Sequence, residues 1–368
     1  MRKTAAFIYL NAYSENIFYG GGAKVNFYII KGLIQKGFDV DVYCKKSNVD
    51  KSEILNNLFV IEENFDEAVE NLQQKYDIVL SVNLNHAAHI TYVHDHTYIE
   101  QSQKVRSPFE RFLYKIFCFA RHNKKMRRHN KYKSKVKDIG KIVVSSQELY
   151  DDYIKNMEIP SQKMYILPPG VDLPLNQNNI SKTQKEKVFG ISAKGIRNKG
   201  GYLVLGAVNK LKKKYDNFKV VIINQNACNN LIVQFLLNFY NIRKYVEFIP
   251  LQDNMDQFYS SIDFLIMPSF RESYGMVTSE AMAYKKPAIV SSVSGAKDLI
   301  VDGQNGYIVD FSSARVDHLA AVMEKAINLE DEKYLVMSQC AYNTVCDMSW
   351  ESFSAKYIQI LEGSYSKS

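Results

Sequence analysis

Short apolar runs alternate with amphipathic stretches along the whole chain. Thr4–Leu10 is an almost continuous apolar run, and Val25–Ile34 carries apolar residues at helical spacing up to Gly37. Apolar runs of this length are typical of buried parallel strands, whereas the second spacing is typical of helices. The pattern predicts a βαβ unit and a doubly wound parallel sheet. Further strands of this half are expected at residues 39–44, 78–82, 90–93, 141–145 and 164–167, and a helix at 147–157.

The same alternation returns in the second half of the chain. Strand-like stretches occur at residues 187–191, 219–223, 245–248, 264–267, 288–290 and 306–309. Helical stretches occur at 202–213, 230–240, 255–260, 278–284, 317–328 and 351–362. Asn176–Lys187 is polar and aperiodic, which makes it the best linker candidate.

We therefore expect an α/β chain with two Rossmann-like domains. The first spans residues 1–172, the second spans 173–349, and a helix at about 350–368 packs back on the first. In open α/β sheets, ligands bind at the carboxyl ends of the strands. Two such domains facing each other would place the binding site in a cleft between them.

Composition excludes several classes of protein. With 368 residues and 46% hydrophobic residues, the chain is too long for one small core and too apolar to be disordered. Its five cysteines form no CxxC pair, which argues against a disulfide framework or a zinc ribbon and favours a reducing compartment. The uncharged stretch Val220–Ile242 is too polar at its centre to span a bilayer. We expect a cytoplasmic protein, either soluble or peripheral at the inner face of the cell membrane.

The positive charge is concentrated in one segment. Residues 104–137 hold 13 Lys and Arg residues against the single acid Glu110, which gives +12 locally and −4 for the rest of a chain with net charge +8. Apolar residues in this segment, from Phe109 to Ala120, follow a helical stripe. A basic amphipathic helix suits an anionic membrane surface. A helix packed on the sheet with a solvated basic face is the alternative, and nucleic-acid binding is a weaker one.

Residues 268–283 carry the strongest chemical pattern. A strand ends at Pro268, Glu272 and Gly275 lie in the following loop, and a helix is expected to begin near Met276. The N–H groups of a helix N-terminus, here those of Met276 and Val277, bind phosphate or sugar hydroxyls, and Gly275 lets the backbone approach a ligand. Glu280 follows Glu272 after seven residues, and two carboxylates suit the hydroxyls of a sugar and a ribose. A solvated Glu pair on an amphipathic helix is the alternative interpretation.

This run resembles the E-x7-E signature of the retaining family 4 glycosyltransferases, which have the GT-B fold. The resemblance implies that Glu272 contacts the donor sugar and Glu280 the ribose of the nucleotide. It extends to the Gly-Gly loop at Gly21 and Gly22, to residues 166–172 between the domains, and to the turn at 302–306. Lys285 departs from the pattern, since the family has glycine there.

A cluster of basic residues resembles the family's diphosphate clamp. Lys199 and Gly200 match the family's Lys-Gly, and Lys194 stands where the family has arginine. Lysine neutralises a diphosphate as a point charge but lacks the bidentate fork, which Arg197 is placed to supply. A basic surface loop without a ligand is the alternative.

A third group of polar residues follows the strand at 90–93. His94, Asp95 and His96 come directly after it, and the resemblance implies that a residue here, commonly histidine, contacts the donor sugar near the reacting carbon. His94 is the first candidate and Asp95 the second. A His-x-His metal site lacks an apparent third ligand, and a purely structural triplet stays open. GT-B enzymes generally need no metal, and we expect no metal and no cofactor besides the donor.

These observations predict a hexosyltransferase that uses a nucleotide-diphosphate sugar, by analogy a UDP-hexose. The predicted catalytic residues are Glu272, His94 and Asp95. The expected acceptor is a lipid-linked or cell-surface glycan, because the short connection before His94 and the basic segment after it are similar to lipopolysaccharide core glucosyltransferases. A non-catalytic GT-B subunit that binds a glycan or polyanion is the alternative, and a nucleic-acid partner is not expected.

Overall fold

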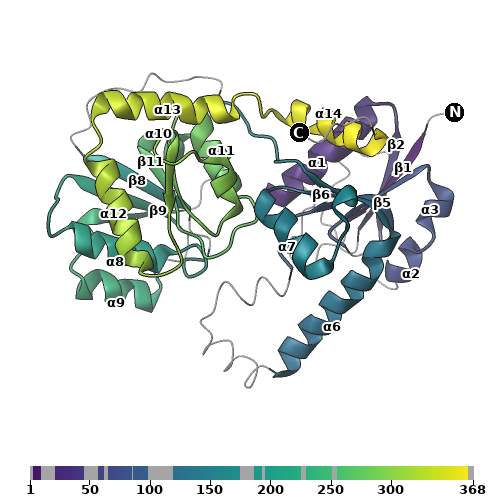
Figure 1. Cartoon of the computed structure of the whole chain (residues 1–368), viewed down its shortest axis with the longest axis horizontal. Coiled ribbons are helices and arrows are strands. Elements are labelled where there is room, and N and C mark those ends of the chain that lie inside the picture. Colours follow the sequence, from purple (N-terminus) through teal and green to yellow (C-terminus); the bar gives the residue numbers. More distant parts are fainter. Residues whose placement is uncertain are drawn as a thin grey trace. The chain divides into compact units, whose positions relative to one another are not determined.

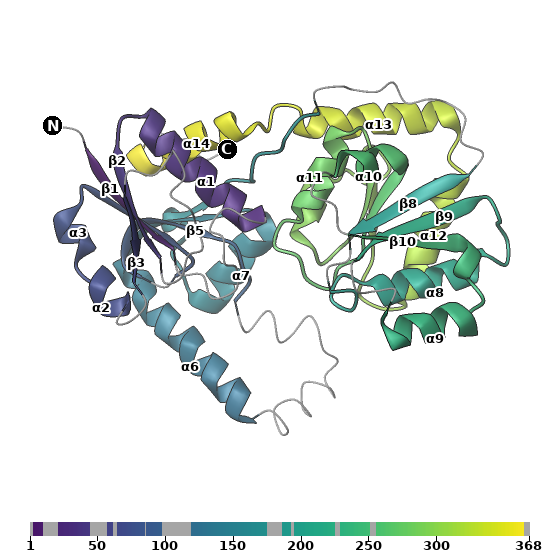
Figure 2. The same cartoon turned by 180° about the vertical axis from the view of Figure 1, so that it is seen from behind.

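The chain forms two compact units. The computed structural model describes residues 3–9, 21–44, 57–61, 65–84, 86–97, 119–174, 186–192, 195–224, 229–250 and 255–363. One unit comprises residues 1–170 and 348–368, and the other comprises 171–347 (Figures 1 and 2). The expected boundaries, 172/173 and 349/350, lie close to these divisions. Most of the expected linker, and the apolar stripe from Phe109 to Phe117, lie outside the described residues.

The first unit contains a seven-stranded sheet in the order β3-β2-β1-β4-β5-β6-β7, and all of its pairs are parallel. Its strands are β1 (Thr4–Tyr9), β2 (Asp39–Cys44), β3 (Asn57–Val60), β4 (Ile78–Val82), β5 (Ala88–Val93), β6 (Ile139–Val144) and β7 (Met164–Ile166). The strand order changes direction between β1 and β4, which makes their carboxyl ends the topological switch point of this sheet. No helix separates β4 from β5, because only residues 83–87 connect them.

Helices cover this sheet on both sides. They are α1 (Gly21–Gln35), α2 (Phe65–Val69), α3 (Leu72–Lys75), α6 (Phe119–Lys135), α7 (Gln147–Met157) and α14 (Trp350–Glu362), with 3₁₀ turns at Val136–Asp138 and Ser161–Lys163. The C-terminal helix α14 lies beside α1 (Figure 1). Tyr28 stacks on Trp350 with ring centroids 4.6 Å apart, and the Ser354 hydroxyl donates to the Tyr28 carbonyl at 2.7 Å.

The second unit contains a six-stranded parallel sheet in the order β10-β9-β8-β11-β12-β13. Its strands are β8 (Lys187–Ser192), β9 (Phe218–Ile223), β10 (Val246–Ile249), β11 (Phe264–Met267), β12 (Ala288–Ser291) and β13 (Gly306–Val309). Its helices are α8 (Gly201–Leu211), α9 (Leu231–Phe239), α10 (Asp256–Ser261), α11 (Met276–Ala283), α12 (Arg315–Ile327) and α13 (Asp331–Val345), with 3₁₀ turns at Arg243–Tyr245 and Gly295–Leu299. Here the strand order changes direction between β8 and β11.

Most expected elements are present, with ends that shift slightly. The predicted helix 147–157 has the expected bounds because the Ser146 hydroxyl caps it, accepting from the Leu149 N–H at 3.2 Å. Helix α1 differs from the prediction, since it begins at Gly21, and the expected Gly-rich turn at 21–22 is its first turn. Among the described residues, the structure contains no helix of sufficient length and apolarity to cross a membrane.

Candidate active site

The switch point of the second sheet brings two loops together. Residues 195–200 follow β8 and residues 268–275 follow β11, and these strands are neighbours. The loops are joined by a hydrogen bond from the Phe270 N–H to the Asn198 carbonyl, 3.1 Å long. Because ligands of open α/β sheets bind at such a point, the two loops form the candidate site of this unit.

An ion pair connects these two loops. The Lys199 ammonium donates to the Glu272 carboxylate, and both side chains are partly exposed. The Glu272 carbonyl accepts from the Gly295 N–H at 2.8 Å, which fixes its backbone to the segment after β12. The structure thus places the cation predicted to bind diphosphate directly against the carboxylate predicted to bind the sugar.

Two glycines shape the loops of this site, Gly200 between the loops and Gly275 within the second one. Gly200 has φ +74°, and a Cβ there would lie 2.0 Å from the Pro268 carbonyl oxygen. Gly275 has φ +78°, and a Cβ there would lie 2.7 Å from the Met267 sulfur and 3.1 Å from Glu272 Cγ. Both positions therefore require glycine for local packing and backbone conformation. Lys285, where the family resemblance leads us to expect glycine, takes a left-handed φ of +59° instead.

Helix α11 starts beside Glu272. It begins at Met276, as the sequence predicts, with Gly275 at its N-cap. The N–H groups of Met276 and Val277 belong to the first turn, whose amides find no acceptor within the helix itself. The partial positive charge at this helix end favours an anion, whether the Glu272 carboxylate or a ligand oxygen.

Glu280 is held by a tyrosine that no sequence motif indicates. The Tyr259 hydroxyl, from α10, donates to a Glu280 carboxylate oxygen at 2.5 Å. Burial, followed by the negative charge of Glu280, raises the pKa of Tyr259 well above its ordinary value, so the hydroxyl keeps its proton. Tyr259 thereby fixes the orientation of the carboxylate. Its only signal in the sequence is an aromatic residue in a predicted helix.

The other predicted phosphate ligands lie near Lys199 in the chain. Arg197 is exposed in the turn at 195–200, two positions before Lys199. Lys194 lies outside the described residues.

The carboxyl edge of the first sheet brings Gly22 and His94 together. A Cβ at Gly22 would lie 3.5 Å from His94 Nδ1, so the start of α1 packs against the imidazole that follows β5. The other ring nitrogen, Nε2, lies 3.3 Å from the side-chain amide oxygen of Asn26, and the backbone N–H of His94 donates to the side-chain oxygen of Asn83 at 3.2 Å. Gly21 precedes Gly22 as the first residue of α1.

His94 is neutral in this environment. Burial lowers its pKa from 6.5 to about 4, although the neighbouring Asp95 acts in the opposite direction. A neutral imidazole whose Nε2 faces an amide oxygen carries its proton on that nitrogen. His94 therefore presents a polar, uncharged group at the carboxyl edge of the sheet.

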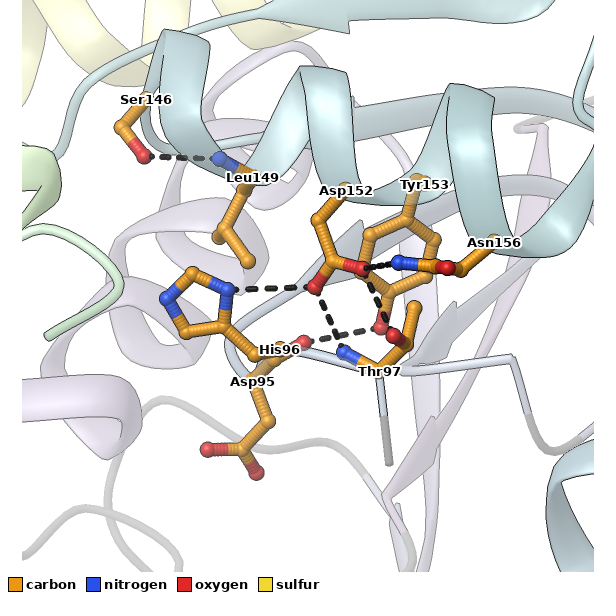
Figure 3. A network of polar contacts seen from close by, with 8 residues as sticks. All are labelled: Asp95, His96, Thr97, Ser146, Leu149, Asp152, Tyr153 and Asn156. Carbon is orange, nitrogen blue, oxygen red and sulfur yellow. Dashed lines mark hydrogen bonds and ion pairs between the residues drawn. The ribbon is translucent and has the colours of Figure 1, made fainter. Parts of the chain in front are cut away.

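A buried polar network lies directly after His94 (Figure 3). The Asp152 carboxylate, from α7, accepts from the Thr97 N–H at 2.8 Å, the Thr97 hydroxyl at 2.6 Å and the Asn156 amide at 2.8 Å, and His96 Nδ1 lies 3.1 Å from it. Burial raises the pKa of Asp152, but hydrogen bonds from His96, Thr97 and Asn156 outweigh it and hold the pKa below its ordinary value. The network ties the segment after β5 to α7.

The two histidines of the His-x-His triplet have different surroundings. His94 contacts Asn26, whereas His96 is buried against Asp152. Asp95, between them, has an exposed side chain, and its carbonyl accepts from the Tyr153 hydroxyl at 2.8 Å. Within the described residues, no group of three His, Cys, Asp or Glu side chains is arranged to hold a metal ion.

The sequence of this chain is similar to those of known glycosyltransferases. Residues 174–344 match the family model described as "Glycosyl transferases group 1". The capsular polysaccharide biosynthesis glycosyltransferase CapM of Staphylococcus aureus is 25% identical over 184 residues, which cover 49% of this chain and 48% of CapM. The chain spans about half the length of the curated relatives it matches.

Two solved structures share the fold over nearly the whole chain. WaaG, a glycosyltransferase involved in lipopolysaccharide biosynthesis, has a TM-score of 0.75 at 18% identity, covering 98% of this chain and all of WaaG. Alr3699/HepE of Anabaena, in complex with UDP and glucose, has a TM-score of 0.73 at 13% identity, covering 97% of this chain and 99% of HepE. The chain therefore has the two-domain α/β fold of GT-B proteins, as the sequence predicts.

Proposed function

We propose that this chain, whose second unit is a group 1 glycosyltransferase domain, transfers a hexose from a nucleotide-diphosphate sugar to a lipid-linked or cell-surface glycan. The observation that carries the proposal is the pairing of Lys199 with Glu272 at the β8/β11 switch point, beside the start of α11. This arrangement puts a cation, a carboxylate and helix N–H groups within one small site. A nucleotide-diphosphate sugar offers a partner to each of them, with phosphate oxygens for the cation and the N–H groups and sugar hydroxyls for the carboxylate.

Donor binding would change the partner of Lys199. A diphosphate carries more negative charge than a carboxylate, so its oxygens attract the ammonium away from Glu272 or share it. Glu272 is then available to accept hydrogen bonds from sugar hydroxyls next to the Met276 and Val277 amides. Without donor, each charged group keeps the other in place, which lowers the cost of ordering them when the donor binds.

The positive groups also assist departure of the leaving group. As the bond between the sugar and the diphosphate breaks, negative charge grows on the phosphate oxygen, and Lys199 and Arg197 stabilise it, with Lys194 assigned to the same role by the resemblance. Glu280, oriented by Tyr259, would accept from the ribose hydroxyls. The retaining outcome follows from the family resemblance, with attack on the same face of the sugar that the diphosphate leaves.

His94 and Asp95 would act from the first unit. A neutral imidazole contributes a hydrogen bond to the sugar without adding positive charge near a carbon that itself becomes positive in the transition state. The low pKa of His94 keeps it in this form. Asp95, with its exposed carboxylate, is the second candidate for contact with the reacting sugar or the acceptor hydroxyl.

The donor can be identified by ligand-linked stabilisation. We propose UDP-hexose, in line with the UDP and glucose bound by HepE. A thermal-shift comparison of UDP-, GDP- and ADP-hexoses tests this, because a ligand at 100 times its Kd stabilises the folded state by about 2.7 kcal/mol. We expect the melting temperature to rise with the UDP-sugar. A shift without any hydrolysis or transfer to glycan acceptors would instead support a non-catalytic subunit.

The basic segment 104–137 would place the enzyme at the cytoplasmic face of the cell membrane. Its described part includes α6, on which Lys124, Lys125 and Arg127 are exposed. Each basic residue near an anionic surface contributes about 1 kcal/mol. Replacing these three by Gln should weaken binding to anionic vesicles and leave donor binding intact. Unchanged vesicle binding would show that α6 is only a solvated face.

A further inference from the structure

Helix α9 of the second unit presents large apolar side chains to solvent. It lies outside α8, at the margin of the unit (Figures 1 and 2). The exposed fractions are 85% for Leu231, 58% for Ile232, 62% for Phe235 and 71% for Phe239. Their spacing puts them on one side of the helix. The rings of Phe235 and Phe239 stack with centroids 5.5 Å apart, so the four residues form one continuous apolar face, here called the α9 face.

The α9 face is held in place by the rest of the unit. Val233 and Leu237, on the opposite side of the helix, are buried in the core. The Asn230 side chain caps the helix by accepting from the N–H groups of Ile232 and Val233 at 3.0 and 3.2 Å. The apolar side chains therefore sit on a helix that is already folded and anchored, and their exposure is a property of the folded protein.

Cations with neutral partners border this face. Arg243 donates to the Asn238 and Gln234 side-chain oxygens at 2.8 and 2.5 Å, on the flank of the helix next to Leu231 and Phe235. Lys212 donates to the Tyr240 carbonyl at the C-terminal end of α9.

The positive charge at this border is not neutralised by nearby acids in the sequence. Lys244 follows Arg243, and residues 229–246 contain no Asp or Glu. The oxygens that hold Arg243 and Lys212 are uncharged, so these contacts orient the cations and leave their charge in place.

We propose that the α9 face docks on an anionic phospholipid bilayer. A contiguous exposed apolar patch marks an interaction site rather than ordinary surface. The Leu, Ile and Phe side chains would enter the boundary between headgroups and acyl chains, while Arg243, Lys244 and Lys212 meet the lipid phosphates. A symmetric contact with a second copy fits less well, because it would bring two identical basic borders together.

This docking is independent of sugar transfer and of helix α6. It uses residues of the second unit that take no part in the Lys199–Glu272 site. Vesicle binding measured without donor therefore tests it separately, and its failure leaves the proposed transferase activity untouched.

The test is sedimentation of the full chain with vesicles of phosphatidylcholine alone, or with about one third phosphatidylglycerol. Replacing Phe235 and Phe239 together by Ser should lower the partition coefficient by about tenfold or more. Replacing Arg243 and Lys244 by Gln should lower it by about fivefold per cation on anionic vesicles only. Val336→Ser is the matched control, because Val336 is 65% exposed on α13 away from this face, and it should change nothing.

A second measurement reports on insertion itself. Phe235→Trp places an indole on the α9 face, while Trp350, the single native Trp, is buried and supplies a constant background. The emission of the introduced indole should shift to shorter wavelength with anionic vesicles. Unchanged partitioning of the Phe235/Phe239 double variant, together with an unshifted indole, would overturn the proposal. So would a concentration-dependent dimer in sedimentation velocity that the double variant abolishes, since the occupant would then be a second copy.

Discussion

The carboxyl edges of the two sheets differ in charge. In the second unit, β8 and β11 lead to the partly exposed ion pair of Lys199 and Glu272. In the first unit, the corresponding edge carries His94, whose pKa of about 4 keeps it neutral. The same architecture thus provides a cation–carboxylate pair in one unit and a neutral imidazole, next to the exposed carboxylate of Asp95, in the other.

The supporting contacts differ as well. The charged site is assembled from two loops that pack closely at Gly200, and Gly275 lets the second loop turn into α11. The neutral site is followed by a buried carboxylate, Asp152, that ties the segment after β5 to α7. The first arrangement allows partners to be exchanged when a ligand arrives, whereas the second favours a fixed geometry.

The largest expected effect is at the charged site. Lys199→Ala should lower kcat/KM for sugar transfer by about 100- to 1,000-fold, because the leaving diphosphate loses a stabilising cation. Steady-state kinetics with the donor identified by thermal shift would measure this. Lys210→Ala is the control, since Lys210 pairs with Asp317 on the same unit and should keep its activity. Equal losses in both variants would show that the ion pair is merely structural.

The next effect is on stability and concerns the Asp152 carboxylate, which holds the segment that follows His94. Asp152→Asn should lower the free energy of unfolding by about 2–3 kcal/mol, since a buried network of charge-assisted hydrogen bonds is broken. Urea unfolding measures it, with the exposed neighbour Asp151→Asn as control. Because the pKa of Asp152 is lowered in the folded state, its contribution to the free energy of unfolding is present above about pH 4 and is lost as the pH falls further. An Asp152→Asn variant that is as stable as wild type, and whose free energy of unfolding falls equally as the pH is lowered, would contradict this.

A smaller effect is expected at Tyr259. Tyr259→Phe removes the hydroxyl that orients Glu280, so KM for the donor should rise by about 3- to 10-fold with kcat almost unchanged. Tyr284→Phe offers a comparison, because its hydroxyl contacts Asp256 instead. A drop in kcat with constant KM would place Glu280 in the chemical step rather than in ribose binding.

We expect the His94 imidazole not to titrate near neutral pH. With a pKa of about 4, His94 stays uncharged between about pH 6 and 8, and kcat/KM should show no histidine-like step from it there. Because the folded-state pKa lies below 6.5, its contribution to stability is complete above that pH and is lost as the pH falls toward 4. NMR titration of the imidazole would measure this directly. A titration midpoint of His94 near pH 6.5 would contradict the contrast between a neutral imidazole in the first unit and an ion pair in the second.

The secondary structure around Glu272 could be predicted from the sequence, because it depends on residues close together in the chain. The strand at Phe264–Met267, the loop after it and a helix beginning at Met276 are all encoded within one short stretch of residues. Helix α13 was missed, because its buried face is built from Tyr334, Met337, Ser338, Ala341 and Val345, a stripe with only weak apolar character. The edge strand β3 was also missed, since it contains only four residues.

Contacts between distant residues could not be predicted in this way. Gly22 and His94 were identified by separate motifs, but their packing depends on how α1 sits against the carboxyl end of β5. Likewise, the pairing of Lys199 with Glu272 joins positions 73 residues apart in the sequence. Asp152 gave no signal, because a single acid in a predicted helix is ordinarily solvated, and only the fold buries it against His96.

Calorimetric titration of the free chain with UDP measures whether Lys199 binds the diphosphate at the β8/β11 switch point. We expect wild-type protein and Lys210→Ala to bind UDP alike, and Lys199→Ala to bind it at least about tenfold more weakly, because a charge-assisted contact to phosphate is lost. UDP binding of equal strength in all three proteins would contradict the placement of the diphosphate at the β8/β11 switch point.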